Sequence, residues 1–332
     1  MMKIDQIWLE MENDNSISSG VLLRRYSGVM LPDVFVALTV PEKIRCIAVS
    51  TTSKVIDVSS FSNLRDIQVE ILPDIKTPTK SIILFKLLNG DHSDIFSVLC
   101  EDLMISVAEI TDERELLREL FNRFEKWKSL FDRSSSSGLT SEEQRGLFAE
   151  MYLLRKYLTS GRWSYRRIVN SWVGPNKEIK DFQNENWAIE VKSTSGNNHQ
   201  RAQISSERQL DTSNLKSLFL FYLSLEKRQQ SGESLHQIIQ SIYDILRADH
   251  ISLSQYRIKL LDAGYFMHHV NLYETTGYTI RNEAFYSVEG DFPRIEERDV
   301  RKGVGDVKYS IILSQCADFI RTEQQVFELT TF

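Results

Sequence analysis

The sequence contains little cysteine, glycine or proline. Its three cysteines, Cys46, Cys100 and Cys316, are widely spaced among 332 residues, and no Cys-x-x-Cys pair is present. This pattern argues against a zinc site and favours a reducing compartment. Glycine (14 residues) and proline (6 residues) fall below their average usage, so extensive disorder is not expected.

Long apolar runs and several enzyme signatures are also missing. The most apolar short stretch, residues 218–223, is far too short to span a bilayer, and residues 1–5 lack the apolar core of a secretory signal. We therefore expect a cytoplasmic protein that is not associated with a membrane. No Ser/His/Asp triad signature, Walker A loop or dinucleotide fingerprint occurs, which argues against those enzyme classes.

The net charge of −6 conceals a basic segment in the middle of the chain. Residues 160–210 carry eight basic and five acidic side chains. Because nucleic-acid affinity depends on local patches rather than on net charge, this segment is compatible with phosphate contacts. The candidates for contact with nucleic acid are Arg166, Arg167, Arg201, Arg208 and Gln209. The first two arginines lie beside aromatic residues, but the same stretch is equally typical of a solvated connection.

An aspartate followed at a distance by a Glu-Val-Lys triplet is the most informative pattern in the chain. Apolar and polar residues alternate over residues 187–192, which predicts a strand with Glu190 and Lys192 on one face. Residues 183–186 are polar and typical of a turn, so Asp181 is expected on a preceding antiparallel strand. Two carboxylates and an ammonium group would then converge from one hairpin.

A four-residue loop in this hairpin would place Phe182 opposite Trp187 and Asp181 opposite Ala188. Asp181 would then lie one diagonal step from Glu190 on the same face. Carboxylate oxygens are the ligands that Mg²⁺ prefers, and bound metal polarises a phosphoryl oxygen. A lysine beside them can orient the attacking water. The hairpin therefore indicates a metal site, and the alternative is an ordinary polar strand face.

A helix is predicted over residues 140–158. Thr140 and Glu143 have the spacing of a capping box, and apolar residues from Leu147 onward form a buried stripe at helical spacing. Glu150 lies three residues after Leu147, so its carboxylate points into or beside that stripe. A glutamate there needs a hydrogen bond, an ion pair or a metal ion. The alternative is a boundary glutamate that pairs with a neighbouring arginine.

Asp181, Glu190 and Lys192 resemble the motif of the PD-(D/E)xK nuclease superfamily, which has the restriction-endonuclease-like fold. The chain departs from the motif at Lys180, where the family has a proline that shapes the backbone and binds no metal. The resemblance implies that Mg²⁺ or Mn²⁺ binds Asp181, Glu190 and the backbone carbonyl of Val191. It also implies that Lys192 positions the attacking water or helps to deprotonate it.

The resemblance assigns a role to Glu150 as well, because nuclease families of this type often carry an acidic residue on the helix before the hairpin. Glu150 would support the metal directly or through water. Residues 140–215 are similar, more specifically, to an uncharacterised prokaryotic family of PD-(D/E)xK members. The stretches that carry this similarity are residues 146–150, 172–175, 181, 188–193 and 204–210, and the resemblance continues at lower specificity through both flanks, including residues 291–295. The implied partners are DNA, restriction–modification or phage-defence proteins and, by symmetry with a duplex, a second copy of the chain.

The expected fold class is α/β (α+β), with a restriction-endonuclease-like αβββαβ core. Residues 1–133 are predicted as an N-terminal β-rich domain ending in a helix, and residues 134–230 as the nuclease-like core. Residues 231–332 are predicted as a C-terminal α+β extension packed on that core. One core strand is not located by the pattern: it lies either near residues 168–169 or within residues 192–204.

The individual elements outside the hairpin follow from periodicity and turn residues. Strands are predicted at residues 34–40, 44–49, 67–72, 81–87, 95–99, 215–225, 256–261, 265–268, 278–281, 284–288 and 307–313, and helices at residues 109–130 and 235–246. Asn89 and Gly90 form the clearest hairpin turn signal of the N-terminal region. Ser205 is expected to cap a short helix that contains Arg208 and Gln209.

The function expected from these features is that of a Mg²⁺-dependent endonuclease that hydrolyses DNA in a prokaryotic restriction or phage-defence system. The alternative is a non-catalytic subunit that binds DNA or scaffolds a multi-protein defence complex. A third interpretation, an RNA-directed or structure-specific repair nuclease, shares the chemistry and differs in substrate. The complete Asp, Glu and Lys set favours an enzyme, because a protein that only binds DNA does not need it.

Overall fold

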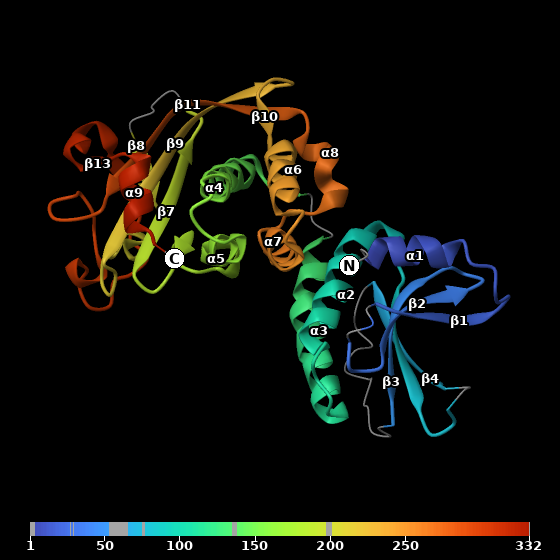
Figure 1. Cartoon of the computed structure of the whole chain (residues 1–332). Coiled ribbons are helices and arrows are strands. Elements are labelled where there is room, and N and C mark those ends of the chain that lie inside the picture. The colour runs from blue at the N-terminus through green and yellow to red at the C-terminus, as the bar shows by residue number, and fades with distance from the viewer. Residues whose placement is uncertain are drawn as a thin grey trace. The chain divides into compact units, whose positions relative to one another are not determined.

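The computed structural model describes residues 4–26, 28, 30–52, 66–74, 77–134, 138–196 and 201–331 (Figure 1). Its residues form two compact units. One comprises Met1–Ser137 with Phe266–His268, and the other comprises Gly138–Tyr265 with His269–Phe332. The mixed α/β fold class is confirmed, whereas the organisation into three regions stays a prediction. None of the helices among the described residues is both long enough and apolar enough to cross a membrane.

The described residues of the first unit form an antiparallel sheet in the order β1-β2-β3-β5-β4 and three α-helices. The strands are β1 (Gly20–Arg25), β2 (Val34–Val40), β3 (Arg45–Thr51), β4 (Ile67–Pro73) and β5 (Ser81–Leu87), and the helices are α1 (Ile4–Glu12), α2 (Ser93–Val107) and α3 (Glu113–Ser134). Trp8 of α1 stacks on Phe96 of α2 with ring centroids 5.6 Å apart. Phe124 of α3 lies 4.8 Å from the ring of Phe85 in β5. Aromatic side chains therefore join the helices to one another and to the sheet.

Four of the five strands expected in this unit are confirmed as β2 to β5, and the expected helix is α3, which begins and ends four residues later. The strand predicted at residues 95–99 is wrong, because this stretch lies inside α2. Its side chains are buried on nearly all sides, and a fully buried helix has no polar face to reveal its period. Asn89 caps a short 3₁₀ helix by accepting a hydrogen bond from Asp91 N, so the predicted hairpin turn is also wrong.

A six-stranded sheet forms the centre of the second unit, in the order β10-β11-β9-β7-β6, with β13 also paired to β11. The strands are β6 (Phe182–Gln183), β7 (Trp187–Thr194), β9 (Ser217–Gln229), β10 (Glu233–Ser234), β11 (Thr276–Ser287) and β13 (Ile320–Arg321). Only β7 and β9 pair in parallel among these strands. A separate two-stranded sheet joins β8 (Arg201–Ile204) to β12 (Tyr309–Ile312).

Different elements pack against the two faces of the large sheet. Alternate residues of β7 and β9, such as Ile189 and Phe221, belong to a large core that includes the apolar residues of α4 (Ser141–Thr159), α5 (Tyr165–Ser171) and α6 (Leu235–Leu246). The residues between them, such as Ala188 and Leu220, pack with Ala202 and Ile204 of β8 in a second core. Glu190 lies on the β8 side, since its strand neighbours face the large core.

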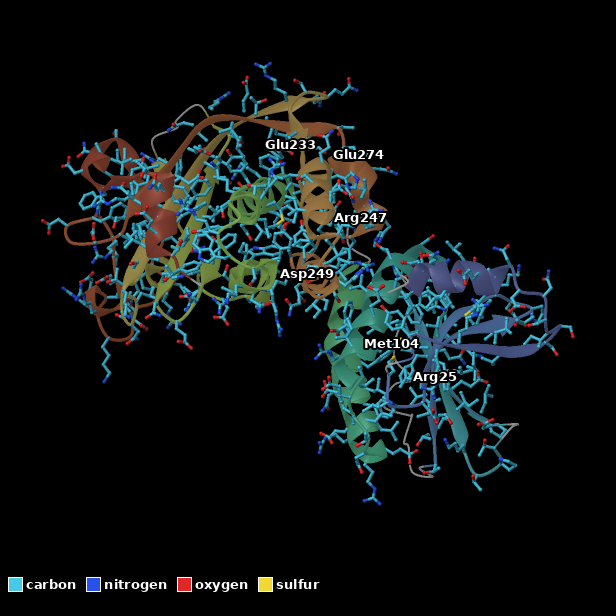
Figure 2. All side chains as sticks on the ribbon, viewed as in Figure 1. Arg25, Met104, Glu233, Arg247, Asp249 and Glu274 are labelled. Carbon is cyan, nitrogen blue, oxygen red and sulfur yellow. The ribbon has the colours of Figure 1, made fainter. Side chains whose placement is uncertain are left out.

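Several elements of this unit differ from the expectation. Residues 256–261 belong to α7 (His250–Asp262), which begins where Asp249, labelled in Figure 2, accepts a hydrogen bond from Ser252 N. The strand expected at residues 265–268 is wrong, because this stretch contains no strand. The two strands expected between residues 278 and 288 are one strand, β11, with an irregularity after Ile280. The remaining helices, α8 (Val270–Tyr273) and α9 (Glu323–Leu329), are short.

The core strand that the sequence did not locate has two partial counterparts. Residues 168–169 lie in α5, so a strand there is wrong, although Trp172 just beyond forms a single antiparallel bridge with Phe182. The stretch from residue 192 to 204 contains β8, which pairs with β12 rather than with the large sheet. The short helix that follows, Glu207–Leu210, is a 3₁₀ helix capped by Ser206 instead of Ser205.

Candidate active site

The pairing register of β6 with β7 is shifted by two residues from the predicted one. Phe182 pairs with Ile189, so Asp181 stands opposite Glu190 in the continued register and not opposite Ala188. Asn184 accounts for the difference. Its side-chain oxygen accepts hydrogen bonds from two backbone N–H groups of the turn, at 2.9 Å and 3.1 Å, which fixes the turn at residues 184–187. The two carboxylates are therefore direct cross-strand neighbours rather than diagonal ones.

The shortness of β6 fixes the position of Asp181. Because β6 begins at Phe182, no residue of β6 lies opposite Val191, and Asp181 Oδ2 accepts the hydrogen bond of the Val191 N–H at 2.7 Å. The backbone carbonyl of Asp181 in turn accepts hydrogen bonds from the N–H groups of Val173 and Gly174, at 2.8 Å and 3.0 Å. The aspartate is thus anchored through both its side chain and its main chain.

Glu150 enters the site from α4. The capping box of Thr140 and Glu143 is present, so this helix begins at the residue that the sequence indicates. The Glu150 carboxylate accepts a hydrogen bond of 2.7 Å from the indole N–H of Trp172, which is completely buried. Trp172 therefore takes the place of the arginine partner that the alternative interpretation suggested.

Gly174 allows the carboxylates of Glu150 and Asp181 to approach one another. A Cβ atom at this position would lie 3.1 Å from Asp181 Oδ1 and 3.3 Å from Glu150 Oε2. Both distances are tighter than ordinary van der Waals contact, so any larger residue would push against the pair. The glycine is therefore required by a close approach and not by its backbone angles.

Lys192 and Glu190 form a buried ion pair. The ammonium nitrogen lies 2.6 Å from Glu190 Oε1, and the exposed fractions of the two side chains are 17% and 1%. No described residue donates a hydrogen bond to Glu190 Oε2. A completely buried carboxylate oxygen without a donor is costly, so this atom is available to a further cation.

The electrostatics of the three acids follow from burial and mutual repulsion. Burial and the charge of Asp181 raise the pKa of Glu150 well above its ordinary value, and they raise the pKa of Glu190 to about 8. Burial also raises the pKa of Asp181, against the opposing effects of Lys192 and the Val191 N–H. Burial alone would lower the pKa of Lys192, but the nearby carboxylates outweigh it and the pKa rises. Bound cations would relieve this repulsion.

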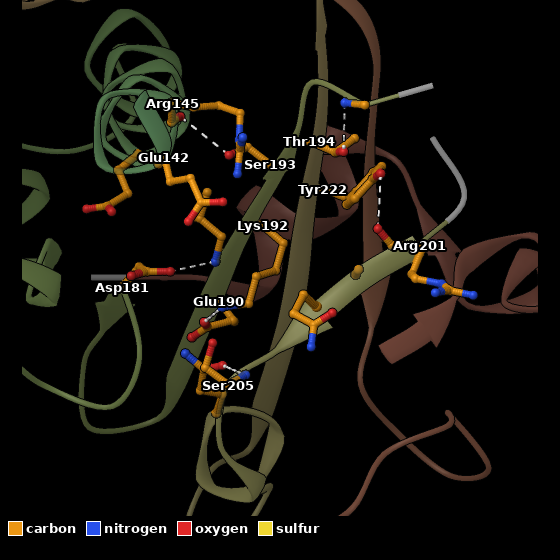
Figure 3. Close-up of a pocket in the computed structure, with 17 residues that line it drawn as sticks. Glu142, Arg145, Asp181, Glu190, Lys192, Ser193, Thr194, Arg201, Ser205 and Tyr222 are labelled. Carbon is orange, nitrogen blue, oxygen red and sulfur yellow. Dashed lines mark hydrogen bonds and ion pairs between the residues drawn. The ribbon is translucent and has the colours of Figure 1, made fainter. Parts of the chain in front are cut away.

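The four residues share one cavity of about 710 Å³, which Figure 3 shows in close-up. Glu150 and Asp181 are half-buried at its wall, so they are accessible from it. A smaller cavity of about 280 Å³ also contains Glu150 and Asp181 in its wall. Lys180, which replaces the proline of the motif, is buried nearby and donates a 3.0 Å hydrogen bond to the carbonyl of Arg208. Lys180 thereby ties β6 to the short helix after β8.

The five candidates for nucleic-acid contact are divided between two places. Arg201 and Gln209 line the cavity. Arg208 is exposed beside it and lies 3.3 Å from Glu297. Arg166 and Arg167 are exposed on α5 and do not line the two cavities described above.

Several cavity residues were not singled out by the sequence pattern. Glu142 and Arg145 are three residues apart on α4 and both line the cavity, but Arg145 lies about 140° around the helix from Glu150, so helical spacing from Glu150 does not reveal it. Tyr222 reaches the cavity from β9 by parallel pairing with Lys192. No local sequence pattern predicts this pairing, and none predicts the contacts of Trp172 and Gly174 with the carboxylates.

The donor set fits a divalent metal ion. Among the described residues, no group of three or more histidine, cysteine, aspartate or glutamate side chains is placed so that it could hold a metal ion by itself. Magnesium sites nonetheless use only one or two carboxylates together with waters and substrate oxygens. The Glu190 oxygen without a donor and the raised carboxyl pKa values both indicate a place for positive charge.

Acids and a lysine that converge from one hairpin, on a mixed α/β fold, define a nuclease-like protein of the PD-(D/E)XK type. The chain belongs to the family described as "Putative PD-(D/E)XK family member, (DUF4420)", whose model matches residues 4–314. Proteins of this superfamily typically use divalent metals, and DNA is the substrate that the family suggests. No curated protein and no solved structure matches the chain significantly.

Replacing Gly174 by alanine is expected to destabilise the protein, whereas the same change at Gly146 is expected to stabilise it. The new methyl group would press on the carboxylates of Asp181 and Glu150, which costs about 1–3 kcal/mol. Gly146 lies inside α4, and a Cβ atom added there would meet no other atom within 4 Å, so alanine should contribute about 0.5–1 kcal/mol. Thermal unfolding of both variants measures the difference. A G174A protein as stable as G146A would contradict the crowding argument.

Replacing Glu150 by glutamine is expected to make the metal-free protein less sensitive to rising pH. The raised pKa of Glu150 means that the folded protein keeps a proton that the unfolded chain loses above about pH 4.5. Wild-type stability should therefore fall as the pH rises, by up to about 1.4 kcal/mol per pH unit from this group. Glutamine at this position still accepts the hydrogen bond from the Trp172 indole, but it does not titrate. Melting curves in EDTA between about pH 5 and pH 8 would refute the account if both proteins lost stability in parallel.

Proposed function

We propose that this protein is a Mg²⁺-dependent endonuclease that hydrolyses phosphodiester bonds of DNA. The observation that carries the proposal is the convergence of Glu150, Asp181, Glu190 and Lys192 in one accessible cavity. A protein that only binds DNA gains nothing from three mutually repelling carboxylates. Their cost in stability is understandable when a metal ion and a charged substrate complete the site.

Each residue has a separate task in this proposal. Asp181 and Glu190, with the backbone carbonyl of Val191, would hold the metal ion, and Glu150 would support it directly or through water. The metal would supply Lewis-acid polarisation of the phosphoryl oxygen. Lys192 would orient the attacking water or help to remove its proton, and its positive charge would offset the charge that grows on the phosphate.

The surrounding contacts support these assignments. The Val191 N–H holds Asp181, and the Trp172 indole holds Glu150, so both carboxylates keep their orientation before substrate binds. Preorganised groups of this kind stabilise a transition state without having to reorganise during the reaction. The ion pair of Lys192 with Glu190 likewise keeps the ammonium group beside the acids.

We further propose that the enzyme acts in a prokaryotic restriction or phage-defence system. This part of the proposal is supported by the family resemblance. Cleavage of both strands of a duplex would be served by a homodimer, and a partner protein of the same system would supply target recognition. Assays with and without the neighbouring gene products test these partners directly.

Replacing Lys192 by alanine is expected to reduce cleavage of supercoiled plasmid by about 10²–10³-fold, because a group that stabilises developing charge is lost. Asp181→Asn should have at least the same effect. Lys216→Ala is the matched control, since this lysine is exposed and does not line the cavity, and it should cut like wild type. Equal rates for wild type and K192A would sink the nuclease proposal. DNA binding that is salt-sensitive but indifferent to Mg²⁺ and to K192A would favour a binding subunit instead.

Metal binding can be tested without cleavage. Mg²⁺ or Mn²⁺ is expected to raise the melting temperature of the wild-type protein relative to EDTA, because an ion that binds only the folded state stabilises it. Asp181→Asn should lose this increase. Lys192→Ala should keep it or enlarge it, since removal of the ammonium leaves the carboxylates more negative. If the metal shifts all three proteins equally, these residues are not its ligands.

A further inference from the structure

Arg145 occupies the cavity beside the acids without a carboxylate partner among the described residues. It lies on α4 five residues before Glu150, and Figure 3 shows its side chain extending from the helix toward β7. Its carbonyl and its guanidinium face two serines at the end of β7: Ser193 Oγ donates to Arg145 O, and Arg145 Nη1 donates to Ser195 Oγ, both at 3.4 Å. These long contacts hold the arginine only loosely.

The missing partner distinguishes this arginine from its neighbour on the same helix. Arg155 is also half-buried, and both of its terminal nitrogens bond to Glu233. No described carboxylate pairs with Arg145, and its Nε is buried without any hydrogen-bond acceptor. An arginine always carries its charge and presents a planar fork that matches carboxylates and phosphates. The unused donor therefore points to an anionic ligand from outside the described chain.

Hydroxyl groups surround this end of the cavity. Ser193 and Thr194 line it from β7, and Tyr222 lines it from β9. Burial raises the pKa of Tyr222 to about 12. The positive charge of Arg145 lowers this pKa and so partly opposes the effect of burial. Glu142, the acidic lining residue closest to Arg145 in sequence, is exposed. One end of the cavity thus holds acids around Lys192, and the other holds an arginine and hydroxyl groups. Ser193 and Tyr222 already donate long hydrogen bonds of 3.4 Å to the backbone carbonyls of Arg145 and Arg201.

We propose that Arg145, with the hydroxyls of Ser193, Thr194 and Tyr222, forms a subsite for a phosphate of the DNA backbone next to the phosphate that is cut. The inference rests on the proposed nuclease function and adds to it a residue that positions the substrate. Glu190, Lys192 and Thr194 alternate along one face of β7 and Ser193 lies on the opposite face. All four line the same cavity, so the cavity leads along the strand from the acids to the subsite. A continuous nucleic-acid backbone can occupy both ends at once.

The ligand chemistry is a phosphate with at least one negative charge, and it could come from a polynucleotide or from free phosphate. Binding of a fluorescent DNA duplex in EDTA, at several KCl concentrations, tests the first source. Arg145→Gln is expected to weaken binding equally for different sequences and to reduce the salt slope by about 0.9, the loss of one phosphate contact. Arg145→Lys keeps the charge and should keep the slope. Glu142→Gln removes an opposing charge from the same helix and should strengthen binding slightly.

A duplex series with one neutral methylphosphonate at successive positions tests the contact itself. For wild type, affinity should fall most when the methylphosphonate replaces one particular phosphate beside the cleavage position. For Arg145→Gln, the methylphosphonate at that position should cause no further loss of affinity, because the contact is already absent. This readout does not change if the variant merely loosens the fold. Melting temperature in sodium phosphate, against chloride of equal ionic strength, tests free phosphate as the ligand. In the contrary outcome, phosphate raises the melting temperature of wild type but not of Arg145→Gln, while the two proteins show the same salt slope for DNA binding. That result would identify free phosphate, and not the DNA backbone, as the ligand of the subsite.

Two failures can be told apart. If wild type binds and cuts DNA but Arg145→Gln has an unchanged salt slope and the same methylphosphonate profile, the subsite is refuted and the nuclease proposal stands. If wild type neither binds nor cuts DNA with Mg²⁺ or Mn²⁺, the proposed function fails and the subsite fails with it. If Arg145→Gln does not fold, the Arg145→Lys slope and the wild-type methylphosphonate profile decide the question.

Discussion

The mutual repulsion of three carboxylates in a poorly hydrated space is the constraint on which this part of the molecule depends. One unit of pKa shift corresponds to about 1.4 kcal/mol, and a domain has only about 5–15 kcal/mol of stability in total. Glu150, Asp181 and Glu190 all have raised pKa values, so the folded protein disfavours their ionised forms, and this lowers its stability as the pH rises. Lys192 offsets part of the repulsion, but one buried oxygen of Glu190 still has no donor among the described residues.

The fold holds these groups together through contacts that have little to do with regular secondary structure. A two-residue strand leaves the Val191 N–H open for Asp181, and an asparagine in the turn sets the register that aligns Asp181 with Glu190. Trp172 and Gly174 follow α5, and they hold and accommodate the carboxylates from the other side. The large core beneath the sheet supplies rigidity, while the chemistry resides where the regular pairing stops.

The sequence predicts the strand and the helix that carry the candidate site better than it predicts several of the surrounding elements, for a physical reason. The alternation around Glu190 and the capping box at Thr140 are local patterns, and the structure confirms the strand and the helix that they indicate. Residues 95–99 and 256–261 were expected as strands, but they lie in helices, because short apolar stretches have no distinct period. The roles of Trp172, Gly174 and Tyr222 depend on long-range pairing, which no single-sequence pattern contains. The placement of the site residues as ligands and catalysts remains a proposal.

The charge distribution in the cavity explains how an acidic protein can accept a polyanion. A net charge of −6 repels DNA at long range, but binding depends on the groups within a Debye length of each phosphate. At the acidic end, divalent metal would reverse the local sign, so the carboxylates become part of a cationic site. At the other end, Arg145, which pairs with no described carboxylate, is already positive. Productive contact with both ends would therefore require metal and phosphate together, whereas the Arg145 end alone can bind a phosphate when metal is absent.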